Sequence, residues 1–182
     1  MSHPVKPSPC LYFTAITTKD PVFWGKVLNN LKEALGNVIL SSQEYEFSAF
    51  TSYYQKEMGY PLFKKIFFFE KIAPPDFIVE LKHLCYQIEL DFSEAGKRKV
   101  NIDPGYITLS KLVLATFKDF SHRIYLGRGV FAEVTLLYQH KNFKDLPWTY
   151  ADYKQEHLFQ TLKMAREILK EKLRCLQENS NI

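Results

Sequence analysis

Strand-like and helix-like segments alternate in a fixed order along the first half of this chain, and that order constrains its fold more than any other feature. Residues 10–17, 38–47 and 62–71 are rich in aromatic and β-branched residues, which favours β-strands. Residues 21–35 and 74–94 place apolar side chains at helical spacing, which predicts two long helices. This alternation is typical of the ferredoxin-like βαββαβ unit.

The second half of the chain supplies the last strand of that unit and an extension. Residues 106–117 predict a strand, and residues 122–126 with 130–138 predict a β-hairpin. A short helix is expected over 51–59, and a closing helix from about 152 to 177. The fold class predicted is therefore α+β, a ferredoxin-like βαββαβ core extended by a C-terminal β-hairpin and closing helix.

Three local signals set the expected boundaries. Asp20 can cap a helix that begins with Pro21 in its first turn. Residues 103–105, Asp-Pro-Gly, are a turn signal, and residues 142–153 predict an irregular aromatic loop. In the hairpin around residues 127–129, a three-residue loop would pair Arg123 with Glu133, whereas a two-residue loop would break that pairing.

Composition limits the class of protein. The chain has 182 residues, 46% of them hydrophobic and 24% charged, which suits one globular domain and argues against disorder. We expect a flexible proline-rich tail over 1–9 and a single domain over 10–178. The three cysteines are far apart, so we expect reduced thiols in the cytoplasm rather than disulfides or a metal site. Residues 1–9 lack a signal peptide's apolar region, and no apolar run is long enough to span a membrane.

Basic residues are concentrated in the middle of the chain. The whole chain has a formal net charge of +4, whereas residues 97–128 contain seven basic and two acidic residues. A positive segment attracts anionic ligands, although a solvated basic face is the commoner explanation. No phosphate-binding loop, dinucleotide motif or nucleophile motif is present in the sequence.

Residues 101–138 place polar side chains among apolar, strand-like ones. Lys111 shares a strand face with apolar residues, and Glu133 lies between Ala132 and Val134, where Arg123 is its expected partner. A buried structural pair is an equal alternative for those two residues. The acid–base candidates, which would be the catalytic residues of an enzyme, are Asp103, Asp119, His122 and Glu133. The expected ligand-binding residues are Lys111, Lys118, Arg123, Arg128, Trp148 and Tyr150.

The motifs NIDPGY, LSKLVLAT, KDFSHRIYLGRGVFAEVTLLY and LPWTYADY, with TSYYQKEMG and FFFEKI before them, resemble a known family. It is a family of short prokaryotic proteins described as a domain of unknown function, number forty-four sixteen. The resemblance extends over about residues 8 to 175. It implies one compact prokaryotic domain and assigns no activity, cofactor or catalytic residue.

Three functions follow from these patterns as hypotheses. The first is a site for a small anionic molecule, either phosphorylated or nucleotide-like, which an enzyme and a binding protein would both provide. The second is an RNA- or DNA-binding module, which the weak net charge and the missing aromatic RNA-binding motif disfavour. The third is a non-catalytic protein-interaction domain. Neither a metal, a cofactor nor an oligomeric state is indicated by the sequence.

Overall fold

β1 (Cys10–Thr18) lies inside the sheet and is buried along its whole length. The computed structural model describes residues 1 and 3–179. β1 pairs antiparallel with β4 (Phe63–Ala73) on one side and with β5 (Val100–Ile107) on the other. A strand with neighbours on both edges and packed layers on both faces carries few polar side chains, in agreement with the largely apolar sequence of β1.

Within the described residues, nine strands form one mostly antiparallel sheet. The other six are β2 (Val38–Ser41), β3 (Tyr45–Glu46), β6 (Lys111–Thr116), β7 (Ile124–Gly127), β8 (Val130–Gln139) and β9 (Asn142–Asp145). The strand order is β2-β4-β1-β5-β6-β8-β7, with β3 beside β4 and β9 beside β8. The α+β class that the sequence predicts is confirmed.

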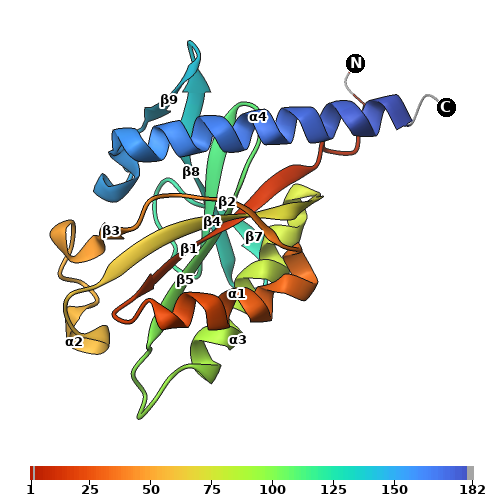
Figure 1. The fold of residues 1–182 in the computed structure, drawn as a ribbon. Coiled ribbons are helices and arrows are strands. Elements are labelled where there is room, and N and C mark those ends of the chain that lie inside the picture. The colour runs from red at the N-terminus through yellow and green to blue at the C-terminus, as the bar shows by residue number, and fades with distance from the viewer. Residues whose placement is uncertain (2, 180–182) are drawn as a thin grey trace.

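Helices cover both faces of the sheet (Figure 1). α1 (Val22–Leu35) and α3 (Ile78–Asp91) pack on one face with Tyr12 and Ile16 of β1. α4 (Glu156–Asn179) packs on the other face with Phe13, so alternate residues of β1 enter the two layers of the core. The short elements are α2 (Gln55–Met58) and the 3-10 turns Phe47–Ala49, Pro75–Phe77 and Ala151–Lys154.

The start of α1 follows from its sequence. The Asp20 carboxylate accepts a hydrogen bond of 3.0 Å from the Val22 N–H, which would otherwise be unpaired in the first helical turn. Pro21 needs no such partner. Gly36 ends the helix at φ +80°, a backbone conformation that residues other than glycine rarely adopt. The predicted boundaries of this helix are therefore confirmed.

The predicted turn at residues 103–105 is wrong, because these residues lie inside β5. Pro104 is tolerated there since the pairing with β6 begins only at Gly105, opposite Leu114. Gly105 is required there because the strand packs closely against its neighbours, and not because a turn forms. A Cβ at this position would collide with the Phe13 ring and the Val113 carbonyl.

Three predicted segments are divided differently from the expectation. The single strand expected over 106–117 is the end of β5, a turn and β6, with the Thr108 hydroxyl accepting from the Ser110 and Lys111 amides in that turn. The strand expected over 38–47 is divided into β2 and β3. The loop expected over 142–153 contains β9, which pairs with β8.

Of the two loop lengths that the sequence left open, the β7–β8 hairpin has the two-residue turn, because Gly127 pairs with Val130. The register then shifts between Tyr125 and Gly127, so that Ile124 lies opposite Ala132. This bulge restores the alignment that the short turn would have lost. Arg123 and Glu133 therefore form an ion pair of 2.8 Å in spite of the two-residue turn.

Candidate ligand-binding site

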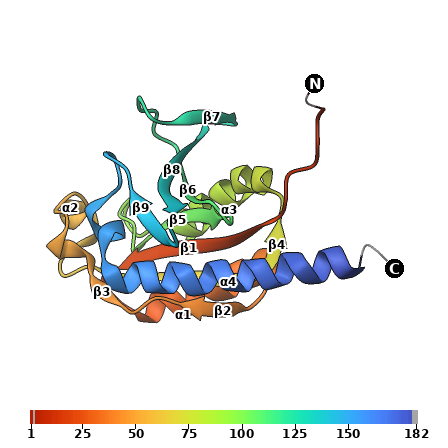
Figure 2. The same ribbon diagram turned by 90° about the horizontal axis from the view of Figure 1, so that it is seen from above.

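A cavity of about 570 Å³ lies where β5 and β6 diverge. These strands pair at three positions, from Gly105–Leu114 to Ile107–Leu112. The pairing of β6 with β5 ends at Leu114, although β6 stays paired with β8 as far as Thr116. Within the described residues, no strand therefore lies on this side of residues 100–104, and Asn101 and Asp103 line the cavity there. Figure 2 shows β7 and β8 standing away from β1 and β4 on that side of the sheet. The divergence of two adjacent strands thus creates the space for a ligand.

Aromatic and ionisable side chains make up much of the cavity wall. The aromatic ones are Phe47, Phe50, Tyr53, Tyr54, Tyr86, Phe117, Tyr150 and Tyr153. The ionisable ones, apart from tyrosines, are Lys64, Lys82, Arg98, Lys118, Arg123, Glu89, Asp103, Glu133 and Asp152. Such a wall offers flat surfaces for stacking and polar groups that fix the orientation of a ligand.

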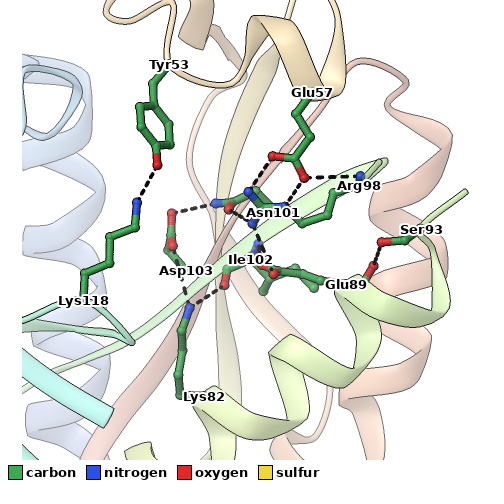
Figure 3. A network of polar contacts seen from close by, with 10 residues as sticks. All are labelled: Tyr53, Glu57, Lys82, Glu89, Ser93, Arg98, Asn101, Ile102, Asp103 and Lys118. Carbon is green, nitrogen blue, oxygen red and sulfur yellow. Dashed lines mark hydrogen bonds and ion pairs between the residues drawn. The ribbon is translucent and has the colours of Figure 1, made fainter. Parts of the chain in front are cut away.

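Two side chains of α3 cover the free edge of β5 (Figure 3). The Ile102 N–H donates a hydrogen bond to Glu89 Oε1, and Lys82 Nζ donates one of 3.3 Å to the Ile102 carbonyl. Both groups would lack a partner here, where no strand lies beside β5, and an unpaired buried peptide group is costly. Burial raises the pKa of the Glu89 carboxyl above its usual range.

Arg98 connects three elements at the rim of the cavity (Figure 3). Its Nε and Nη2 donate to the two oxygens of Glu57 in α2, at 2.6 and 2.8 Å. Its Nη1 donates to Asn101 Oδ1 at 2.9 Å and lies 3.4 Å from Glu89 Oε2. The bidentate contact with Arg98 lowers the pKa of the Glu57 carboxyl. The charge of Arg98 is therefore neutralised within the protein.

A second neutralised pair lies deep in the wall. Lys64 Nζ is 2.7 Å from Asp152 Oδ2, and both side chains are 4% exposed. The Tyr45 hydroxyl donates a further hydrogen bond of 3.0 Å to the same oxygen. The Lys64 ammonium also lies 4.6 Å from the Phe47 ring centre and 4.9 Å from that of Tyr153.

The Glu133 carboxylate forms a third group of polar contacts in the cavity wall. Its Oε2 accepts from Arg123 Nε at 2.8 Å and lies 3.0 Å from His122 Nε2. Arg123 Nη2 also donates to the Tyr150 hydroxyl at 2.8 Å. The His122 ring stacks on Trp148 with 5.0 Å between ring centres. These five residues form one connected unit at the wall of the cavity.

Lys118 and Asp103 differ from the paired groups. Among the described residues, the Lys118 ammonium has one hydrogen-bond partner, the Tyr53 hydroxyl at 2.8 Å. That contact lowers the pKa of Tyr53. In the described part of the chain, the Asp103 carboxylate accepts one hydrogen bond, from Asn101 Nδ2 at 2.9 Å, and lies 3.9 Å from Lys82 Nζ. Its side chain is 34% exposed.

Seven of the predicted site residues lie at the cavity or in contact with its wall. The structure places Asp103, Lys118, Arg123, Glu133 and Tyr150 in the lining. His122 contacts Glu133, and Trp148 stacks on His122. The other three, Asp119, Lys111 and Arg128, are not in that lining. Arg128 lies instead at the tip of the β7–β8 hairpin, 3.3 Å from Glu80 of α3.

Several cavity residues were not predicted from the sequence, among them Lys82 and Glu89. They lie on the buried side of α3, on the same stripe as Ile78 and Cys85. Two charged residues within an apolar helical stripe were a signal of a polar site, because unpaired charges are rarely buried. Arg98 and Asn101 had no such signal, since their roles depend on the distant α2 and α3.

Two kinds of feature are missing from the described residues. No group of three or more His, Cys, Asp or Glu side chains is placed to hold a metal ion within residues 1 and 3–179. None of the helices in that part of the chain combines the length and the apolarity needed to cross a membrane.

Comparison with known proteins agrees with the resemblance of the sequence motifs. No curated protein and no solved structure matches the chain. A family model matches residues 8–169, which include every strand and most of α4. The chain therefore belongs to the family described as Domain of unknown function (DUF4416).

Proposed function

We propose that the cavity binds a small anionic molecule, phosphorylated or nucleotide-like. The observation that carries this proposal is the difference between the cations of the wall. Lys64, Arg98 and Arg123 each have a carboxylate within 2.8 Å. Lys118 donates to a phenol, and Lys82 has a carboxylate only at 3.9 Å among the described residues. These two ammonium groups retain donors for a ligand's anionic group.

The aromatic wall supports a ligand that also contains a ring. Phe117 lies 5.5 Å from Tyr86, and Tyr53 lies 4.9 Å from Tyr54, measured between ring centres. All four rings line the cavity beside Lys82 and Lys118. Flat rings beside cations stack a heterocyclic base or a sugar ring.

A thermal-shift panel tests this proposal. The probes are inorganic phosphate, AMP and ribose 5-phosphate at low salt, added to the wild type, Lys118→Met and Lys111→Met. At ~100 times its dissociation constant, a ligand stabilises the folded state by about 2.7 kcal/mol. We expect a shift in Tm for the wild type and for Lys111→Met, whose substitution lies outside the lining, and a loss of it for Lys118→Met. The absence of any shift in the wild type, or an equal loss in both variants, would refute the proposal.

The nucleic-acid alternative has less support. Of the basic run at residues 97–99, Arg98 points toward Glu57 and Lys99 Nζ lies 2.9 Å from Glu94. Phosphate contacts by free Lys and Arg supply most non-specific affinity for nucleic acids. A short labelled RNA, added at low salt, would bind to the wild type if this alternative were correct.

The protein-interaction alternative rests on a different surface. Ile124 and Tyr125 of β7 are 69% and 59% exposed, at one end of the sheet order. Exposed apolar edge strands are typical of interaction sites. Sedimentation at increasing concentration tests this alternative, since association without any response to anions would favour it.

We also propose a ferredoxin-like core for the fold and a cytoplasmic location. The order β2-β4-β1-β5, with α1 and α3 on the same face, supports the first. The three free cysteines, of which Cys10 and Cys85 are buried, support the second. Burial raises the pKa of the Cys10 thiol to about 12, which makes this thiol unreactive at neutral pH.

A further inference from the structure

The carboxylates of the cavity differ from one another as clearly as the cations do. Glu89 accepts from the Ile102 N–H and contacts Arg98, Glu133 accepts from Arg123, and Asp152 accepts from Lys64 and Tyr45. Asp103 is the exception. Among the described residues it has one hydrogen-bond donor, the Asn101 amide, although a carboxylate accepts about four hydrogen bonds.

Asp103 also lies near other polar side chains of the cavity wall. It extends from β5 toward Lys82 of α3, on the side where Lys118 and Tyr53 lie (Figure 3). Burial raises the pKa of the Tyr54 hydroxyl, and the charge of Asp103 is the second cause. The same charge contributes to the raised pKa of Tyr150 and Tyr153, after larger effects of burial and nearer groups. The charge of Asp103 thus acts on aromatic residues from two separate segments of the chain.

The distance between Lys82 and Asp103 has a chemical consequence. Lys82 Nζ lies 3.9 Å from Asp103 Oδ1, which exceeds a direct hydrogen bond. A hydroxyl group placed to one side of the line between them, within hydrogen-bond distance of both, accepts from the ammonium and donates to the carboxylate. Lys82 has donors left for this contact, since an ammonium carries three and the Ile102 carbonyl accepts one.

A second hydrogen-bonding group in the lining has no partner. Tyr153 is 1% exposed and lines the cavity, and its buried hydroxyl has no hydrogen-bond partner within the described residues. A buried hydroxyl without a partner costs about 1–3 kcal/mol. The Tyr153 hydroxyl is therefore an unsatisfied polar group among the residues of the cavity wall.

We propose that Lys82 and Asp103 recognise the hydroxyl groups of a sugar, so that the anionic ligand is a ribose or related sugar carrying phosphate. This inference rests on the proposed function and adds the hydroxyl groups as the feature that the site distinguishes. A carboxylate that accepts a hydrogen bond from the ribose 2′-hydroxyl is a known mode of ribose recognition. The phosphate lies at Lys118 in this arrangement, and the aromatic rings contact the sugar or an attached base. Nucleotides and free sugar phosphates share this chemistry.

Paired ligands that differ by one hydroxyl test the inference. Calorimetric titrations compare AMP with 2′-deoxy-AMP, and ribose 5-phosphate with 2-deoxyribose 5-phosphate. We expect the hydroxyl to strengthen binding by about ten- to a hundredfold in the wild type, the range for a hydrogen bond to a charged group. If the protein prefers the hydroxylated ligand only between AMP and 2′-deoxy-AMP, the ligand is a nucleotide. If it prefers ribose 5-phosphate over 2-deoxyribose 5-phosphate to the same extent, the ligand is a sugar phosphate. Either result supports the inference.

The variant Asp103→Asn keeps the size of the side chain and an oxygen that accepts from Asn101. We expect the preference for the hydroxyl to fall to about threefold or less in this variant, while the 2′-deoxy ligand binds as before. The control Asp119→Asn changes a carboxylate outside the lining and keeps the full preference. The ratio of two affinities is independent of a modest loss of stability, and Asp103→Ala repeats the measurement with the carboxylate removed.

Two outcomes overturn the inference, and they are distinguishable. Equal affinity for hydroxylated and deoxygenated ligands in the wild type overturns the sugar inference but leaves the proposed anion site intact. A preference for the hydroxylated ligand that persists in both Asp103 variants also overturns it, because other residues must then bind the hydroxyl. If inorganic phosphate, AMP and ribose 5-phosphate all fail to bind, the proposed function fails and the inference fails with it.

Discussion

The Lys64 ammonium lies 2.7 Å from the Asp152 carboxylate, and both side chains are 4% exposed. Removal of one partner leaves the other charge buried without compensation, which costs about 3–5 kcal/mol. We expect Asp152→Asn to lower the free energy of unfolding by that amount in urea titrations. The double variant Lys64→Met/Asp152→Asn should recover part of the loss, because no charge then remains buried.

An exposed ion pair provides the control for this prediction. Arg174 Nη2 lies 2.7 Å from Glu171 Oε2 on α4, at the same distance as the buried pair, but the two side chains are 65% and 56% exposed. We expect Glu171→Gln to change the free energy of unfolding by less than about 1 kcal/mol. A loss in Asp152→Asn no larger than this would contradict the buried-pair assignment.

Gly105 and Gly25 should respond in opposite directions to the same substitution. Gly105→Ala places a methyl group against the Phe13 ring and the Val113 carbonyl, and we expect it to destabilise the fold by about 1–3 kcal/mol. Gly25 lies in α1, where a Cβ would meet open space within 4 Å, so Gly25→Ala should stabilise the fold by about 0.5–1 kcal/mol. Chemical denaturation of both variants checks the pair. Equal effects would show that β5 and Phe13 are less closely packed than the structure indicates.

Much of the fold follows from local signals that the sequence contains. The strand-like runs and the Asp20–Pro21 helix start predict β1 and the beginning of α1, because both depend on neighbouring residues. The prediction of a turn at residues 103–105 is wrong, because Pro104 and Gly105 are residue types common in turns but lie here inside β5. Their place in β5 depends instead on Phe13 of β1, which is distant in sequence, and on the pairing of β5 with β6, which begins only at Gly105.

The residues that line the cavity differ in the same way, because some of their contacts are local in sequence and others are not. The sequence predicts the contact between Arg123 and Glu133 because Arg123 directly precedes β7 and Glu133 lies in β8 of the same hairpin. Arg98 was missed because its partners Glu57 and Glu89 come from two other elements. Contacts within one hairpin can be predicted from the spacing of residues in the sequence. Contacts between elements that are distant in sequence become apparent only in the packed structure.

Glu89 and Glu57 should give opposite pH dependences of stability. Burial raises the folded-state pKa of Glu89, so between the usual glutamate pKa and that higher value the folded state holds a proton that the unfolded state has lost. The stability contribution of Glu89 therefore falls as pH rises through this window. Arg98 lowers the folded-state pKa of Glu57, whose contribution is present above the usual pKa and is lost as pH falls through the folded-state pKa.

Urea unfolding between about pH 3 and 7 checks both signs, with Glu89→Gln and Glu57→Gln compared with the wild type. The difference in the free energy of unfolding, wild type minus Glu89→Gln, should decrease as pH rises. The corresponding difference between the wild type and Glu57→Gln should increase. Parallel curves for the two variants would mean that Glu89 is not held in the desolvated position beside Ile102.

The contact between Lys118 and Tyr53 should be visible in the ionisation of tyrosine. The Lys118 ammonium donates to the Tyr53 hydroxyl at 2.8 Å and lies 4.5 Å from the centre of its ring, and this contact lowers the pKa of Tyr53. A nearby cation stabilises the phenolate, so Tyr53 should ionise at lower pH in the wild type than in Lys118→Met. Ultraviolet titration of phenolate absorbance measures the difference. In a Tyr53→Phe background, the Lys118→Met substitution should leave the titration curve unchanged, and a persisting shift would place the effect of Lys118 on another of the cavity tyrosines.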